Sequence, residues 1–141
     1  MIGCHGCRAT LRRAKPSWSP FRERLPTDAE LTAWFRDGQC NIAVVGGAVS
    51  GGLVVLDIES ILAFESWRRF ATTLLDEAII ATLPVVRTGQ GKHVYFRMVN
   101  PIGNRTLAKR RRQRAERGTP RYEVVAETRG EGGLALAPPS V

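Results

Sequence analysis

The chain has 141 residues, of which 43% are hydrophobic and 24% charged, and a formal net charge of +8. This length and composition are typical of one globular domain, and they exclude wholesale disorder, a collagen repeat and a disulfide scaffold. No apolar run approaches the roughly 20 residues of a membrane-spanning helix, and the first residues lack the apolar stretch of a signal peptide, so we expect a cytoplasmic protein without a membrane partner.

The positive charge is concentrated in two segments. Residues 8–24 carry a net charge of +5 and residues 105–121 carry +7, so the remaining residues sum to −4. A mildly acidic body with two basic segments suits a polyanionic partner, either nucleic acid or nucleotide phosphates. A solvated basic surface without a partner is the alternative.

The first elements predicted along the chain are an arm and a helix. Residues 1–26 are basic and interrupted by prolines, which is typical of an extended arm with little regular structure. Trp18 and Phe21 are the side chains that would attach this arm to the body. A capping-box pattern from Thr27 to Glu30 then predicts a helix that Gly38 ends.

The middle of the chain predicts two strands and a long helix. Residues 41–45 and 53–59 have the composition of strands and flank a glycine-rich turn, so they predict a β-hairpin. From Ser60 to about Ala81 apolar residues recur at helical spacing, and Pro84 ends this helix.

The last third of the chain predicts four further strands and an irregular segment. Residues 84–88 and 93–98 predict two strands joined by a glycine-containing turn, and residues 122–126 and 134–137 predict two last strands around a glycine-rich turn. Residues 99–121 are polar, basic and rich in turn formers, so they predict a mobile excursion with a short helix. This order of elements predicts an α+β fold with a mixed or antiparallel sheet covered by helices.

The three cysteines leave a zinc site open as an alternative. Cys4 and Cys7 form a CxxC pair, which is half of a structural zinc site. The second pair of ligands would have to come from Cys40 and His93, neither of which has the usual spacing. Reduced thiols without a structural role are the other interpretation, and the odd number of cysteines argues against a disulfide framework.

The strongest candidate for chemistry is a pair of acids at the end of the second predicted strand. Because side chains alternate along a strand, Asp57 and Glu59 share one face, whereas Val54, Leu56 and Ile58 form the apolar opposite face. Two like charges about 4 Å apart repel by roughly 4 kcal/mol at an effective dielectric constant near 20. A divalent cation bound by both carboxylates would relieve this repulsion. Alternatively, the acids mark a solvated strand end beside a helix N-terminus.

A third acid and several basic residues extend this candidate site. If the strand from Tyr122 neighbours the first, Glu127 joins the two acids and completes a metal site for phosphoryl or nucleotidyl transfer. The residues that could contact phosphate lie at strand ends beside glycine-containing turns; they are Arg87, Gly91, Lys92, His93 and Arg129. Tyr95 and Phe96 should line opposite faces of their strand, so at most one can approach a substrate.

Five stretches, in order, resemble the primase-polymerase (prim-pol) domain of the archaeo-eukaryotic primase superfamily. They are Lys15-Pro16 with Trp18; residues 41–44 leading to 50–59; residues 87–96; Gly103-Asn104 with Leu107-Ala108; and residues 127–133 with 137–140. The resemblance covers about residues 15–141. It departs from the family pattern at three positions. Glu59 and Glu127 stand where the family usually has Asp, and Gly91 stands where it often has Ser.

The resemblance implies a metal-dependent enzyme on an RRM-like sheet flanked by helices, with residues 27–141 as the catalytic domain and a truncated C-terminal end. Asp57, Glu59 and Glu127 would bind two ions of Mg²⁺ or Mn²⁺, and His93 would contact the phosphates of an incoming NTP or dNTP. The residues that would bind a single-stranded DNA template are Arg12, Arg13, Lys15, Arg105, Lys109, Arg110, Arg111 and Arg112.

The implied activity is primer synthesis, DNA polymerisation or both, in the replication of a phage, plasmid or mobile element, with a replicative helicase in cis or in trans as a possible partner. Two other functions stay open. One is a non-catalytic module that binds single-stranded nucleic acid on the same fold, and the other is a different nucleotide-processing enzyme on a similar sheet.

Overall fold

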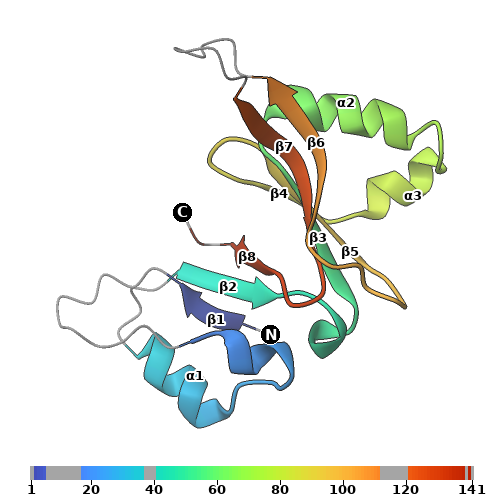
Figure 1. Ribbon diagram of the computed structural model, residues 1–141. Helices are drawn as coiled ribbons and strands as arrows, with labels where there is room; N and C mark the ends of the chain where they lie inside the picture. Colours follow the sequence, from blue (N-terminus) through green and yellow to red (C-terminus); the bar gives the residue numbers. More distant parts are fainter. Residues whose placement is uncertain (1, 6–16, 37–40, 112–120, 139, 141) are drawn as a thin grey trace.

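The structure is a computed structural model that describes residues 2–5, 17–36, 41–111, 121–138 and 140. Within these ranges the strands form two antiparallel sheets, and the helices pack beside them (Figure 1). The strands are β1 (Ile2–His5), β2 (Asn41–Val45), β3 (Leu53–Ile58), β4 (Val85–Arg87), β5 (Lys92–Arg97), β6 (Arg105–Arg111), β7 (Tyr122–Arg129) and β8 (Leu134–Ala137). The α-helices are α1 (Asp28–Phe35), α2 (Ile61–Ala71) and α3 (Glu77–Thr82).

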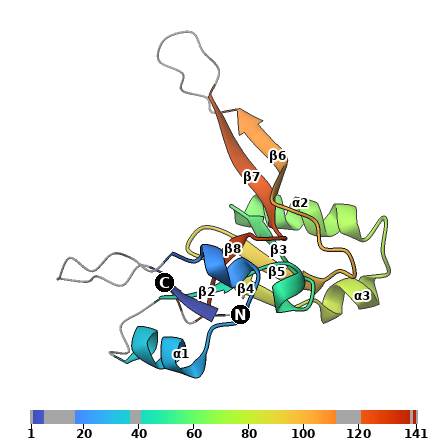
Figure 2. The same ribbon diagram turned by 60° about the horizontal axis from the view of Figure 1, so that its bottom comes forward.

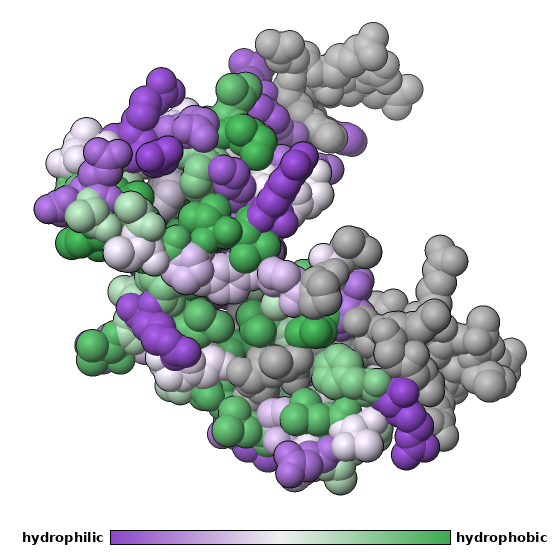
Figure 3. Space-filling model, turned by 180° about the vertical axis from the view of Figure 1, so that it is seen from behind, coloured by the Kyte–Doolittle hydropathy of each residue, from purple (hydrophilic) through white to green (hydrophobic). Residues whose placement is uncertain are grey.

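The larger sheet has the strand order β4-β5-β3-β7-β6, and the smaller one has the order β1-β2-β8. Helices and antiparallel sheets together are compatible with the predicted α+β class, although the described strands form two sheets where one was predicted. Seen from behind, the surface is indented between the part that holds the larger sheet and the part that holds the smaller one (Figure 3). No helix in the described ranges is long and apolar enough to span a membrane.

Strand β3 is central because both of its edges and most of its side chains are covered. It pairs with β5 on one side and with β7 on the other. Val54, Val55 and Ile58 are at most 1% exposed. Helix α2 covers one face of this sheet, where Phe64 packs against Leu56, Ile58 and Val94.

The predicted hairpin of residues 41–45 and 53–59 is wrong, because the two strands lie in different sheets. The glycine-rich turn between them contains three residues with positive φ, Gly47, Gly51 and Gly52, which turn the chain away from direct pairing. Only an isolated bridge between Gly47 and Leu53 remains. Strand β2 instead pairs with β1 and β8.

The predicted helix of residues 60–81 is two helices. After α2 the hydroxyls of Thr72 and Thr73 donate to backbone carbonyls three residues earlier, and these local hydrogen bonds compete with helix continuation. The Asp76 carboxylate then accepts a hydrogen bond from the Ala78 N–H at 2.8 Å and caps α3.

The segment 1–26 contains more regular structure than the arm that we predicted. Residues 2–5 form β1, and a 3-10 helix covers Ser19–Arg22. The expected attachment of this segment is confirmed for Phe21, which is buried and has its ring centroid 4.9 Å from that of Trp34. The capping box of Thr27 and Glu30 is also confirmed at the start of α1.

The excursion predicted for residues 99–121 is wrong for its first half, which contains strand β6. Every residue of β6 is exposed, so no apolar alternation marked it in the sequence. It forms because the free edge of β7 offers a ladder of backbone hydrogen bonds. Residues 126–129 of β7 pair with β3, whereas residues 122–124 pair with β6 alone. This outer part is a two-stranded ribbon that projects from the body (Figure 2).

Candidate metal and nucleotide site

The register of the larger sheet places Asp57 between two other predicted site residues. Asp57 of β3 lies directly opposite His93 of β5 and directly opposite Glu127 of β7. Side chains in directly opposed positions project from the same face of a sheet. The strand of Glu127 is therefore a neighbour of β3, which was the condition for Glu127 to join the two acids.

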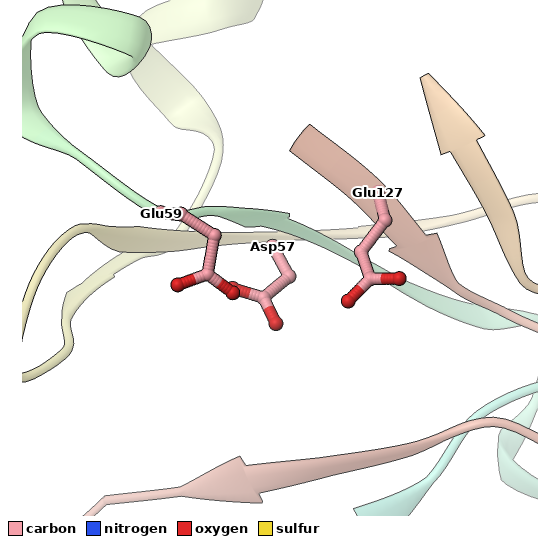
Figure 4. Close-up of side chains that lie close together, drawn as sticks. All are labelled: Asp57, Glu59 and Glu127. Atoms are coloured by element: carbon pink, nitrogen blue, oxygen red, sulfur yellow. The ribbon is translucent and has the colours of Figure 1, made fainter. Parts of the chain in front are cut away.

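Glu59 joins these residues one step beyond the end of β3. Its backbone N–H donates to the Val125 carbonyl at 3.0 Å, which continues the ladder with β7 and keeps its side chain on the face of Asp57. One carboxylate oxygen from each of Asp57, Glu59 and Glu127 lies within 4.8 Å of the others. Figure 4 shows the three carboxylates on the same side of the sheet and pointing away from it.

The three acids, which we call the acid cluster, repel one another. At this separation each pair of charges costs about 3–4 kcal/mol at an effective dielectric constant near 20. Glu59 is exposed, yet partial desolvation raises its pKa, and the negative charges of Asp57 and Glu127 raise it further. Glu59 also lies directly before Ser60, the N-cap of α2. The alternative to a metal site, a strand end beside a helix N-terminus, therefore also fits the position of Glu59.

Two side chains, Arg129 and His93, contact the acids. The Arg129 guanidinium donates to a Glu127 carboxylate oxygen, and its Nε lies 3.9 Å from Oδ2 of Asp57. The His93 ring is buried, and its Nε2 lies 3.2 Å from Oδ1 of Asp57. Asp57 is thus held between Arg129 and His93, each on a different carboxylate oxygen.

Tyr95 is a site residue to which sequence reasoning assigned no role. It projects from the same face as His93, two residues away, and its hydroxyl oxygen lies 3.4 Å from Nδ1 of His93. The hydroxyl also donates to the Leu136 carbonyl of β8 at 3.4 Å, which connects the two sheets beside the site. Burial, and to a smaller extent the charge of Asp57, raise the pKa of Tyr95. The signal available in the sequence was that Tyr95 lies two residues after His93, a spacing that places both side chains on one face of a strand.

Lys92 and Arg87 are not brought to the acid cluster. Lys92 lies opposite Ile58 in the register, on the face that α2 covers, and its Nζ is 3.9 Å from the centroid of the Phe64 ring. Arg87 lies opposite Lys92 and shares that face. Phe96 packs against the core on the same side, which confirms that Tyr95 and Phe96 line opposite faces.

Gly91 is required where the predicted motif usually has serine. A Cβ at this position would lie inside van der Waals contact with the Ile58 carbonyl oxygen and close to the backbone of Glu59 and Ser60. The backbone of the turn therefore approaches the end of β3 more closely than any side chain permits.

The basic residues predicted to bind nucleic acid fall into two groups. Arg105, Lys109, Arg110 and Arg111 belong to β6 and are exposed. Arg12, Arg13, Lys15 and Arg112 lie outside the described residues. Cys7 and Cys40 of the alternative zinc site also lie outside them, so that alternative stays a prediction.

The acid cluster fits a hard divalent cation. Its donors are carboxylate oxygens, the ligands that Mg²⁺ and similar ions take in proteins. A metal–oxygen distance of about 2.1 Å implies separations of about 3–4 Å between neighbouring or opposite ligand oxygens, which the spacing of the cluster allows.

Comparison with known families agrees with the resemblance noted in the sequence. A model of the family described as bifunctional DNA primase/polymerase, N-terminal, matches residues 8–141. No curated protein matches the chain. Such a domain indicates nucleotidyl transfer of the primase or polymerase type, with nucleic acid and nucleotides as substrates and a general dependence on metal.

Proposed function

The chain belongs to the bifunctional DNA primase/polymerase N-terminal family, and from this premise we propose that it transfers nucleotides to a 3′-hydroxyl under the direction of a single-stranded DNA template. The observation that carries the proposal is the acid cluster, in which carboxylates of two neighbouring strands converge within 4.8 Å. We further propose that the activity serves the replication of a phage, plasmid or mobile element, with a helicase as partner.

In this proposal Asp57, Glu59 and Glu127 hold two ions of Mg²⁺ or Mn²⁺. When bound, such ions activate the attacking hydroxyl and neutralise charge on the triphosphate and the leaving pyrophosphate. The buried ring of His93 holds one oxygen of Asp57 and so fixes the direction of the carboxylate. Glu59 and Glu127 are longer than the usual Asp, and the convergence of their oxygens supports their use as ligands.

Arg129 is the residue that we propose for the triphosphate. Its guanidinium is about one-third exposed and already lies at the edge of the acid cluster. Once the acids are neutralised, the guanidinium is available to donate two parallel hydrogen bonds to a phosphate. The resemblance assigns His93 to phosphate, but its two ring nitrogens lie beside Asp57 and Tyr95, so a phosphate contact of His93 stays a prediction from the resemblance. Lys92 and Arg87 have no place in this proposal, since they lie on the opposite face.

We also propose that the larger sheet is the RRM-like catalytic sheet that the resemblance implies. The central position of β3 supports this, because it gives the acids a rigid base with strands on both sides.

Incorporation of labelled nucleotide tests the proposal. The assay uses primed and unprimed single-stranded DNA with NTPs or dNTPs, and Mg²⁺ or Mn²⁺. We expect metal-dependent incorporation that Asp57→Asn lowers about 100-fold or more, equivalent to about 2.7 kcal/mol of transition-state stabilisation. Glu65→Gln, which removes an exposed acid of α2, should leave the rate unchanged.

Product from the unprimed template would identify a primase, and product from the primed template alone a polymerase. The mechanism is wrong if Asp57→Asn retains full activity. Absence of incorporation with salt-sensitive binding of single strands would instead support the non-catalytic binding module.

A further inference from the structure

The two faces of the ribbon formed by β6 and the outer part of β7 differ in chemistry. Arg110 lies opposite Glu123 in the register, on the face that carries Glu127. Its Nε donates to Oε1 of Glu123 at 2.7 Å, so the charge of Arg110 is paired on this face.

The other face is basic and carries an exposed aromatic ring. Lys109 lies opposite Val124, and Arg111 lies directly opposite Tyr122. The β7 residues of this face are Tyr122, Val124, Ala126 and Thr128, none of them acidic. Tyr122 is 60% exposed, and Lys109 and Arg111 are exposed as well. We call Lys109, Arg111 and Tyr122 the Tyr122 face.

An aromatic ring flanked by two cations suits one kind of ligand. Proteins that bind single strands place basic side chains along the phosphates and stack bases on aromatic rings. Opposed residues on neighbouring strands have Cβ atoms about 5 Å apart, so Arg111 can reach the phosphate beside a base that stacks on Tyr122. The bases of a duplex are stacked on one another and cannot accept the ring in this way.

Resting on the proposed function and naming its template contact, we propose that the Tyr122 face binds single-stranded nucleic acid. One base stacks on the ring of Tyr122, and Lys109 and Arg111 hold the neighbouring phosphates. The ribbon projects from the body (Figure 2), and Tyr122 lies beyond the part of β7 that pairs with β3. Arg110 takes no part, although it is a neighbour with the same charge.

The test is fluorescence anisotropy of a labelled oligothymidylate of about 12 nucleotides, within the usual site size of such proteins, titrated with the full chain at several salt concentrations. Tyr122→Leu should weaken binding about 10-fold, while Tyr122→Phe keeps the ring and should bind like the wild type. Lys109→Gln with Arg111→Gln should weaken binding and reduce the salt slope by about 1.4, which is about 0.7 for each phosphate contact. Arg69→Gln, which removes an exposed cation of α2, is the control and should change little.

Three results would overturn the inference: wild-type binding by Tyr122→Leu, an equal loss in Arg69→Gln, or an equal loss for a blunt duplex of the same sequence. Circular dichroism melting of each variant separates loss of binding from loss of folding. If Tyr122→Leu unfolds, the folded Tyr122→Phe still tests the stacking claim, which predicts normal binding.

Failure of the proposed function gives a different pattern. In that case nucleotide incorporation is either absent or unchanged in Asp57→Asn, while Tyr122→Leu still loses binding. If the proposed function holds and the inference fails, incorporation depends on Asp57 but its template KM is unaffected by Tyr122→Leu.

Discussion

Glu59 lies in surroundings that oppose its own ionisation. Partial desolvation and the charges of Asp57 and Glu127 raise its pKa above the ordinary value of 4.5. The folded chain therefore holds this proton more tightly than the unfolded chain. Stability is lost as the pH rises through the interval between 4.5 and the raised pKa, and the loss is complete above it.

Replacement of Glu59 by Gln should consequently raise the melting temperature of the metal-free protein at pH 7, well above the ordinary value of 4.5, because the raised pKa costs the wild type stability there. Near pH 4, below the ordinary value, this cost is absent and the two proteins should melt together. Differential scanning calorimetry in the presence of EDTA measures both. A gain of the same size at the two pH values would show that relief of repulsion is not its cause.

Addition of Mg²⁺ or Mn²⁺ provides the complementary measurement on the same variant. A ligand that binds only the folded state raises the melting temperature, so the wild type should gain stability from the ion. Glu59→Gln loses one of three carboxylate ligands and should gain less.

Helix α2 holds the larger sheet from the face opposite the acids, and its two phenylalanines have opposite environments. Phe64 is 5% exposed within the core, whereas Phe70 is 63% exposed. The Phe64 ring also lies beneath the ammonium group of Lys92, so this one side chain packs the helix on β3 and β5 together.

Phe64→Ala should lower the free energy of unfolding by about 3–5 kcal/mol, because it removes apolar burial and leaves a cavity. Phe70→Ala makes the same chemical change on the same helix and should stay within about 0.5 kcal/mol of the wild type. Urea denaturation at equilibrium measures both. Similar losses in the two variants would contradict the packing of α2 described above.

The two sheets of the molecule meet beside the site, where the hydroxyl of Tyr95 links β5 to the Leu136 carbonyl of β8. The acids point into this region from the larger sheet (Figure 4). The relative position of the sheets therefore bears on how a substrate can approach the acids.

Tyr95→Phe removes this hydroxyl and keeps the ring, so we expect it to cost about 0.5–1.5 kcal/mol of stability at pH 8. The raised pKa of Tyr95 means that the wild type loses stability as the pH rises above 10.0, since its phenol resists ionisation only when folded. The difference between the proteins should therefore shrink at pH 10.5. Chemical denaturation at both pH values measures it, and a variant as stable as the wild type at pH 8 would exclude the link.

What the sequence alone determined about this protein is local in origin. Alternation along residues 53–59 placed Asp57 and Glu59 on one face, the pattern of Thr27 and Glu30 located the start of α1, and the order of five motifs identified the family. Each of these depends on residues a few positions apart, where backbone geometry fixes side-chain direction.

The tertiary structure alone decided which strands are neighbours. The pairing of β3 with β7 brought Glu127 to Asp57, the pairing of β3 with β5 sent Lys92 to the far face, and β2 paired outside the hairpin that its turn suggested. Strand β6 carries no apolar pattern and exists through the free edge of β7. Pairing joins residues far apart in the chain and is settled by the competition of all strands for the same edges, which the local spacing of side chains does not encode.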